Sequence, residues 1–231
     1  MLRVAITRAA PENARTAERV RARGAEAILA PLLTITPRAH DTSTAGAQAL
    51  LFTSTNGVRA FGGARELPVL TVGDATADAA REAGFTKVHS ADGDVTALAA
   101  LARSTLDPAR GKLLHIAGDH VAGDLNATLG AAGFSVERRL AYASLAATAL
   151  PAELMAPLDI VLFHSPRAAQ TFVRLGAPDA AALTAACFSE TVAEAARAAA
   201  WKSIIVAPAP REEALLDAAL GARHSPAGAS A

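Results

Sequence analysis

Polar side chains gather where predicted strands give way to predicted helices. Five junctions carry hydroxyl, amide or charged groups: Thr7-Arg8, Thr53-Ser54-Thr55-Asn56, Gly73-Asp74-Ala75-Thr76, His164-Ser165, and Gly118-Asp119 through Gly123-Asp124. The first turn of a helix leaves backbone N–H groups unpaired, so such turns can bind carboxylates or phosphates. The same residue types are also ordinary helix N-caps, and that simpler role stays open for each junction. Arg8 directly follows the first strand and is well placed to bind an anion. A surface salt bridge is an equally open role for it.

Tyr142 is the only tyrosine in the chain. A phenol has an ordinary pKa of about 10, so it is protonated at neutral pH and can donate a proton or a hydrogen bond to a leaving oxygen. Packing of an amphipathic ring between two domains is the alternative.

The common catalytic motifs are not found in this sequence. It contains neither a P-loop nor a GxGxxG turn, and Ser165 lacks the flanking glycines of a nucleophile elbow. His115 and His120 have no cysteine nearby, which speaks against a zinc site. His164 is expected to line a pocket or end a strand.

The chain nearly repeats itself. Leu50 to Phe61 (LLFTSTNGVRAF) returns as Val161 to Phe172 (VLFHSPRAAQTF), and Asp74 to Arg81 is echoed by Glu190 to Arg197. A spacing of about 110 residues is too long for a solenoid repeat and predicts two whole domains of similar build. Clefts between domains are common sites for small molecules.

Composition narrows the function classes. Lys+Arg and Asp+Glu are equal at 22 each, which argues against a nucleic-acid-binding surface. The single cysteine, Cys187, lies in an apolar run and is expected to be a buried hydrophobe in a reducing, cytoplasmic setting. A strand begins almost at once, without a leader, and no apolar run reaches membrane-spanning length. A soluble protein is therefore expected.

Short apolar runs alternate with helical patterns, which predicts an α/β chain with parallel sheets. Proline residues bracket an extended link at 31–37, and the chain turns polar and irregular after Tyr142. Five strands are expected between these links and five outside them. The expected domains are a discontinuous one (1–33 and 148–220) and an inserted one (38–141), joined by a hinge at 34–37 and 142–147. The tail, 221–231, is expected to be disordered.

Taken together, the motifs resemble the uroporphyrinogen-III synthase family. The sequence VAITR at Val4–Arg8 matches the family's opening strand, and LFTSTNGV from Leu51 resembles its "FTSxNGV" turn. FHSP from Phe163 resembles the "FxSP" turn, and VGDATA from Val72 the "VGxxTA" turn. Tyr142 falls where the family has a hinge tyrosine. The resemblance runs in order to about Leu220.

The resemblance implies two similar α/β domains joined by a two-stranded β hinge, with the active site between them. It implies a lyase that uses no cofactor or metal. A monomer is expected because no exposed apolar stripe stands out in the sequence. The enzyme would cyclise hydroxymethylbilane, a polycarboxylate, to uroporphyrinogen III with inversion of ring D and loss of water. Tyr142 and Thr76 would be the catalytic residues. Substrate would be bound by Thr7, Arg8, Thr53, Ser54, Thr55, Asn56, Ser165, Pro166 and Thr191.

Two departures from the family pattern stand out. Val192 occupies the position of the second domain's threonine, with Thr191 one residue early, and Glu190 would repel carboxylates unless it points away. The turn at Gly118-Asp119-His120 lacks the arginine often found there. Two other functions stay open from the residues alone: a non-catalytic two-domain binder of an anionic small molecule, and a nucleotide-sugar or phosphate transferase.

Overall fold

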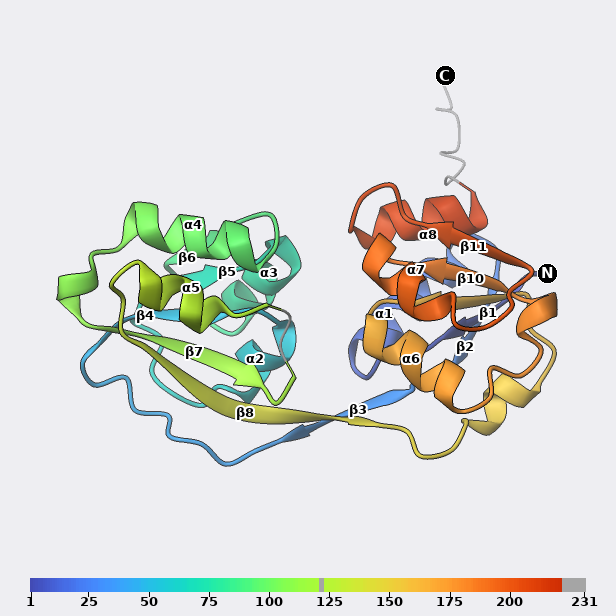
Figure 1. The fold of residues 1–231 in the computed structure, drawn as a ribbon, viewed down its shortest axis with the longest axis horizontal. Coiled ribbons are helices and arrows are strands. Elements are labelled where there is room, and N and C mark those ends of the chain that lie inside the picture. Colours follow the sequence, from blue (N-terminus) through green and yellow to red (C-terminus); the bar gives the residue numbers. More distant parts are fainter. Residues whose placement is uncertain (121–122, 222–231) are drawn as a thin grey trace, which may run out of the picture. The chain divides into compact units, whose positions relative to one another are not determined.

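The computed structural model describes residues 1–120 and 123–221. The chain divides into two compact units. Unit 1 comprises Met1–Thr34 and the residues from Leu145 onward, and unit 2 comprises Ile35–Ser144. Each unit holds one sheet flanked by helices (Figure 1). The predicted α/β class is confirmed.

The sheet of unit 1 has the strand order β11-β10-β9-β1-β2, and all its pairs are parallel. Its elements, in chain order, are β1 (Arg3–Ile6), α1 (Glu12–Arg21), β2 (Glu26–Leu29), β9 (Ile160–Phe163), α6 (Pro166–Arg174), β10 (Thr184–Cys187), α7 (Glu190–Ala196), β11 (Ser203–Val206) and α8 (Glu212–Leu220). Short 3-10 turns lie at Ala152–Met155 and Ala180–Ala182.

The sheet of unit 2 has the order β3-β8-β7-β4-β5-β6, and β8 through β6 run parallel. Its elements are β3 (Leu33–Pro37), β4 (Ala47–Phe52), α2 (Thr55–Ala60), β5 (Val69–Thr71), α3 (Asp74–Glu82), β6 (Val88–Ser90), α4 (Val95–Thr105), a 3-10 turn (Pro108–Arg110), β7 (Lys112–Gly118), α5 (Leu125–Ala131) and β8 (Val136–Ala146).

Both sheets are covered on two faces, which explains why their central strands are continuous apolar runs. In unit 1, α6 and α7 bury one face, and α1 and α8 bury the other. In unit 2, α2 and α3 cover one face, and α4 and α5 cover the other. All four residues of β9, for example, are buried. The polar junction residues lie beyond the carboxyl ends of the strands, where the helices begin.

The two units are circular permutations of one arrangement. Starting at β9, unit 1 runs β9-α6-β10-α7-β11-α8 and then, from the other chain end, β1-α1-β2. Unit 2 runs β4-α2-β5-α3-β6-α4-β7-α5-β8 with the same spatial order of strands and the same pairing of helices on each face. His164 therefore corresponds to Thr53, and the strand registers match Ile6 with His115.

The sequence repeat corresponds to a packing repeat. Phe52 and Phe61 meet edge to face at 6.1 Å, and Phe163 and Phe172 do so at 5.7 Å. Each pair links the strand before the junction to the helix after it. The matched letters thus preserve the same strand–turn–helix contact twice.

One expectation about the crossings is wrong: the chain after Tyr142 was expected to be irregular, but β8 stays extended until Ala146. The 31–37 link is extended as expected, and most of it forms a strand, β3, that the strand count did not include. Backbone bonds from Arg38 N to Ala141 O (2.8 Å) and from Ala147 N to Leu32 O (2.9 Å) flank this pairing. Strand pairing between distant segments leaves no local sequence signal. The prolines and polar residues of these segments therefore favoured a prediction without strands.

Cys187 is fully buried, as expected. Burial raises the pKa of its thiol to about 12. The tail predicted to be disordered, 221–231, lies outside the described residues except for Gly221.

Candidate functional site

Each sheet has one point where the chain leaves neighbouring strands in opposite directions. In unit 2 this switch point lies between β4 and β7, and in unit 1 between β1 and β9. Open α/β sheets bind ligands at the carboxyl ends of strands at such points. The predicted junction residues Thr53-Ser54 and Gly118-Asp119 flank the first, and Thr7-Arg8 and His164-Ser165 flank the second.

Tyr142 lies at the switch point of unit 2. Its position on β8 pairs with Gly118 at the end of β7, and its side chain is only 6% exposed. Its phenol is hydrogen-bonded to the Ser54 hydroxyl and the Gly118 backbone. Burial raises the pKa of Tyr142 against the opposing Ser54 bond, and the nearby Asp119 carboxylate raises it further. The phenol is therefore neutral and able to donate.

Gly118 is required for this placement. A Cβ on Gly118 would lie 2.6 Å from Cε2 and 2.7 Å from Cζ of the Tyr142 ring. Because Gly118 has no side chain, the Tyr142 ring packs directly against the backbone at the end of β7.

The turn after Gly118 is tied to β8 by charged groups. Ser144 N donates to Asp119 Oδ1 at 3.0 Å, and His120 Nδ1 lies 3.0 Å from the same oxygen. Burial opposes the charge, but these hydrogen bonds lower the pKa of Asp119 to about 2. Arg138, on β8, donates to the carbonyls of Gly118 (2.6 Å) and Asp119 (3.3 Å). An arginine from the next strand thus serves the turn that lacks one of its own.

Thr53 is linked to a buried histidine. His115 Nδ1 lies 3.0 Å from Asn126 Oδ1, and its Nε2 lies 3.3 Å from Thr53 Oγ1. An amide oxygen only accepts, so Nδ1 carries the proton and Thr53 donates its own to Nε2. Burial lowers the pKa of His115, which keeps the ring neutral. Thr53 then offers a ligand lone pairs instead of a proton.

The other predicted residues of unit 2 surround this point at helix starts. Ser54 caps α2 by accepting from Asn56 N at 3.1 Å, and Thr53 through Asn56 are half-buried. Thr76 lies in the first turn of α3 and is 6% exposed. Gly73 precedes that helix in an extended conformation, and a Cβ added there would meet nothing within 4 Å. By contrast, a Cβ on Gly57 would lie 2.6 Å from Ile116 O, so Gly57 is required by close packing against β7.

In unit 1, two predicted residues are engaged within the fold. Thr7 is fully buried and donates to Leu162 O at 2.6 Å, which joins β1 to β9. Arg8 pairs with Glu212 at 2.8 Å, the salt bridge left open as its alternative. Ser165 caps α6 by accepting from Ala168 N at 3.2 Å, and Pro166 begins that helix.

The position of the second domain's threonine holds a valine, Val192, and the structure places this valine among apolar residues. Val192 is 2% exposed and belongs to the hydrophobic core of unit 1, whereas the equivalent Thr76 of unit 2 is a buried polar residue, 6% exposed. Thr191 is exposed, and Glu190 pairs with Arg197 at 2.5 Å. Unit 1 therefore lacks the buried hydroxyl that unit 2 has.

Within the described residues, no group of three histidine, cysteine or acidic side chains is arranged to hold a metal ion. Over the same part of the chain, no helix is long and apolar enough to cross a membrane.

Comparison with known proteins decides the family. The uroporphyrinogen-III synthase HemD family profile matches residues 14–217. The chain belongs to the uroporphyrinogen-III synthase family. No curated protein sequence matches the chain.

Solved structures agree on the fold of the uroporphyrinogen-III synthase family. The Helicobacter pylori 26695 uroporphyrinogen-III synthetase is similar with a TM-score of 0.69 at 16% identity, covering 95% of this chain and 99% of that one. A mutant uroporphyrinogen III synthase of the extremely thermophilic bacterium Thermus thermophilus gives 0.57 at 17% identity, covering 94% and 96%.

As a member of the uroporphyrinogen-III synthase family, the chain is a lyase-type enzyme of tetrapyrrole biosynthesis. Of the expected site residues, the fold brings Tyr142 and Ser54 into contact and sets Thr53 beside His115. Arg138 and the role of His115 have no sequence signal, because both depend on strand register: His115 and Arg138 are paired on β7 and β8.

Proposed function

We propose that this chain closes hydroxymethylbilane to uroporphyrinogen III, with inversion of ring D and loss of water, and that Tyr142 protonates the departing hydroxyl. The observation that carries this role is the buried phenol held at the β4–β7 switch point by Ser54 and Gly118. A general acid must be protonated at neutral pH and fixed in one orientation. Burial supports the first condition, and the two hydrogen bonds support the second.

In the proposed step, the phenol proton passes to the substrate hydroxyl oxygen as its C–O bond breaks, and water leaves. The electron pair of the adjacent pyrrole nitrogen stabilises the cation left behind. Ring D attacks that carbon through its substituted α-carbon, which gives a spirocyclic intermediate. The bond from this α-carbon to the methylene of ring C then breaks, and the methylene cation left on ring C bonds to the free α-carbon of ring D. That carbon loses its proton, which returns to the Tyr142 phenolate. Since the open chain also closes spontaneously to the wrong isomer, the enzyme's main task is orientation.

Carboxylates of the substrate are proposed to bind at the helix starts. In unit 2 the donors are Thr55, Asn56 and Thr76, supported by the positive start of α3. In unit 1 they are Arg8, Ser165 and Thr191, with Pro166 shaping the start of α6. Thr53, Ser54 and Thr7 enter the proposal as positioning residues, because the hydroxyl of each is hydrogen-bonded inside the fold.

A product-isomer assay tests this function. Hydroxymethylbilane is incubated with and without the protein, and the uroporphyrinogen isomers are separated. The proposal predicts isomer III in excess with the protein present. A binding protein without catalysis would leave isomer I as the product in both samples.

The proposal also includes a hinge, a cytoplasmic location and a monomeric state. The chain passes between the units in β3 and in β8, and we propose that residues 34–37 and 142–147 act as a hinge. A cytoplasmic location is supported by the free thiol of Cys187. A monomer is proposed as well, which light scattering on the purified chain tests.

A further inference from the structure

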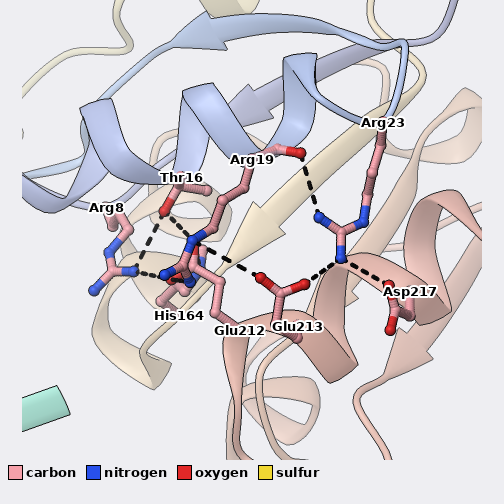
Figure 2. A network of polar contacts seen from close by, with 8 residues as sticks. All are labelled: Arg8, Thr16, Arg19, Arg23, His164, Glu212, Glu213 and Asp217. Atoms are coloured by element: carbon pink, nitrogen blue, oxygen red, sulfur yellow. Dashed lines mark hydrogen bonds and ion pairs between the residues drawn. The ribbon is translucent and has the colours of Figure 1, made fainter. Parts of the chain in front are cut away.

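The carboxyl edge of unit 1 carries a charged cluster of which the proposed function uses only Arg8. We call Arg8, Thr16, Arg19, His164 and Glu212 the Glu212 cluster (Figure 2). Arg8 and His164 follow β1 and β9, the two strands of the switch point. Glu212 begins α8, which follows the sheet's last strand. The cluster thus occupies the place where an open α/β sheet binds its ligand.

The carboxylate of Glu212 is bound as a ligand carboxylate would be. Arg8 Nη1 donates to its Oε2 at 2.8 Å, Arg19 Nη1 lies 3.8 Å from the same oxygen, and the Thr16 hydroxyl donates to Oε1. The Glu212 side chain is only 15% exposed. Figure 2 shows these three donors converging on Glu212 from α1 and the end of β1. Guanidinium and hydroxyl donors are the groups that recognise carboxylates.

His164 lies beside this carboxylate without bonding to it. Both ring nitrogens are buried and have no hydrogen-bond partner among the described residues, and the side chain is 8% exposed. Its Nε2 stands 4.0 Å from Glu212 Oε1, beyond hydrogen-bond distance. Burial lowers the pKa of His164 well below its ordinary value, with Arg8 adding to the effect, so the ring is neutral. A buried group left without a partner calls for an explanation.

A purely structural ion pair does not supply that explanation. A pair between Arg8 and Glu212 needs no histidine, and an apolar ring at 164 would pack on Phe188 equally well, since the rings lie 5.8 Å apart. A ligand carboxylate, which is not tied to α8, could accept from Arg8 and Thr16 and lie about 1 Å nearer to His164 than Glu212 does, within hydrogen-bond distance of the ring. The neutral imidazole would then donate through its N–H.

We propose that Glu212 is an internal carboxylate seated in a carboxylate-binding site, and that a carboxylate of the substrate displaces it and takes up the bonds of Arg8, Thr16 and His164. The identity of the ligand rests on the proposed function, whereas the carboxylate site does not. Because the site is open only when Glu212 has left it, the apparent affinity is reduced by the open fraction. A polycarboxylate held elsewhere on the protein overcomes this more readily than a lone anion does.

The substitution Glu212→Gln tests the displacement. It removes the internal anion with little change of shape, and Glu213→Gln is the matched control because it removes the same charge from the next residue, which pairs with Arg23 at 2.5 Å. Ring nitrogens of ¹⁵N-histidine-labelled protein are followed during titration with glutarate at constant pH and ionic strength. The His164 signal should respond to at least about tenfold less glutarate in Glu212→Gln than in wild type. Glu213→Gln should titrate as wild type does.

Equal titration of wild type and Glu212→Gln overturns the proposal, and so does an equal gain in Glu213→Gln, which would show a general charge effect. Wild-type protein labelled uniformly with ¹⁵N provides a test without any substitution: saturating glutarate must shift the Arg8 Nε and His164 signals together, and a shift in neither overturns the site.

The effect of Glu212→Gln on substrate binding is measured in a separate experiment. The KM of Glu212→Gln for hydroxymethylbilane should fall, and an unchanged or higher KM overturns displacement by substrate. If no form of the protein makes isomer III, the proposed function fails while the glutarate titration still decides the site.

Discussion

At the scale of residues, the proposed chemistry depends on the buried phenol of Tyr142. Tyr142 is protonated because water is excluded from it and because Asp119 lies nearby, and it is oriented because Ser54 and Gly118 bind its oxygen. Desolvation and hydrogen bonding thus give this side chain the protonation state and the orientation that the proposed general acid needs.

Tyr142→Phe should keep the fold and lower kcat for isomer III by roughly 10²–10⁴-fold, the usual contribution of general acid catalysis. The phenyl ring still packs against Gly118, so the melting temperature should change little. Stopped assays of isomer III formation and a thermal melt provide the two readouts. A wild-type kcat would remove the acid role from Tyr142 and leave the family assignment intact.

Thr76→Ala should reduce kcat/KM for hydroxymethylbilane by about 1–3 kcal/mol in transition-state free energy, the range for a hydrogen bond to a charged group. Thr105→Ala is the control, since its hydroxyl is exposed on α4 and donates to Leu101 O at 2.7 Å. Steady-state kinetics of both variants decide the matter. Equal values for the two would make Thr76 a structural residue of α3.

Three glycines at the junctions differ at the scale of elements. A Cβ would meet the Tyr142 ring at Gly118 and a β7 carbonyl at Gly57, but open space at Gly73. Gly118→Ala should therefore displace the Tyr142 ring and lower kcat with a modest loss of stability, about 1–3 kcal/mol for an overpacked site. Gly73→Ala should leave stability within about 0.5 kcal/mol. Unfolding curves and kcat are measured for both, and an active Gly118→Ala enzyme would show that the ring position is not critical.

The link between Asp119 and β8 predicts a pH dependence. The pKa of Asp119 is lowered from 3.8 to about 2, so its carboxylate stabilises the fold above pH 3.8 and loses that effect as the pH falls through 2. Asp119→Asn should be destabilised at pH 7 by no more than about 1 kcal/mol, because partly exposed charges are screened. Denaturant unfolding at several pH values should show this difference shrinking below pH 4. A difference that is constant with pH would mean that the charge contributes nothing.

Local signals predicted most of the elements, and distant pairings supplied the rest. Thr53, Ser54 and Ser165 were found from the sequence because each lies between its own strand and helix. Arg138 reaches the Gly118 turn only because β8 pairs with β7, and β3 is a strand only because it lies beside β8. The hydrogen-bond partners of side chains could not be predicted from the sequence either. The hydroxyls of Thr7 and Thr53 were expected to bind substrate, but each donates its proton to a group within its own unit.

At the scale of the whole molecule, one strand order serves both units, although the chain traces it from different starting points. Unit 2 is continuous, whereas unit 1 takes its first two strands from one end of the chain and three from the other. The repeated turn after β4 and β9 therefore flanks the switch point in each unit. Unit 2 places a phenol there, and unit 1 places the Glu212 cluster.

The isomer composition of the product tests the account most directly. Hydroxymethylbilane is converted by wild type and by Tyr142→Phe at equal protein concentration, and isomers I and III are quantified against a sample without protein. Isomer III should dominate with wild type, and the Tyr142→Phe product should shift toward isomer I as spontaneous closure competes. Isomer I alone in the wild-type sample would contradict the account.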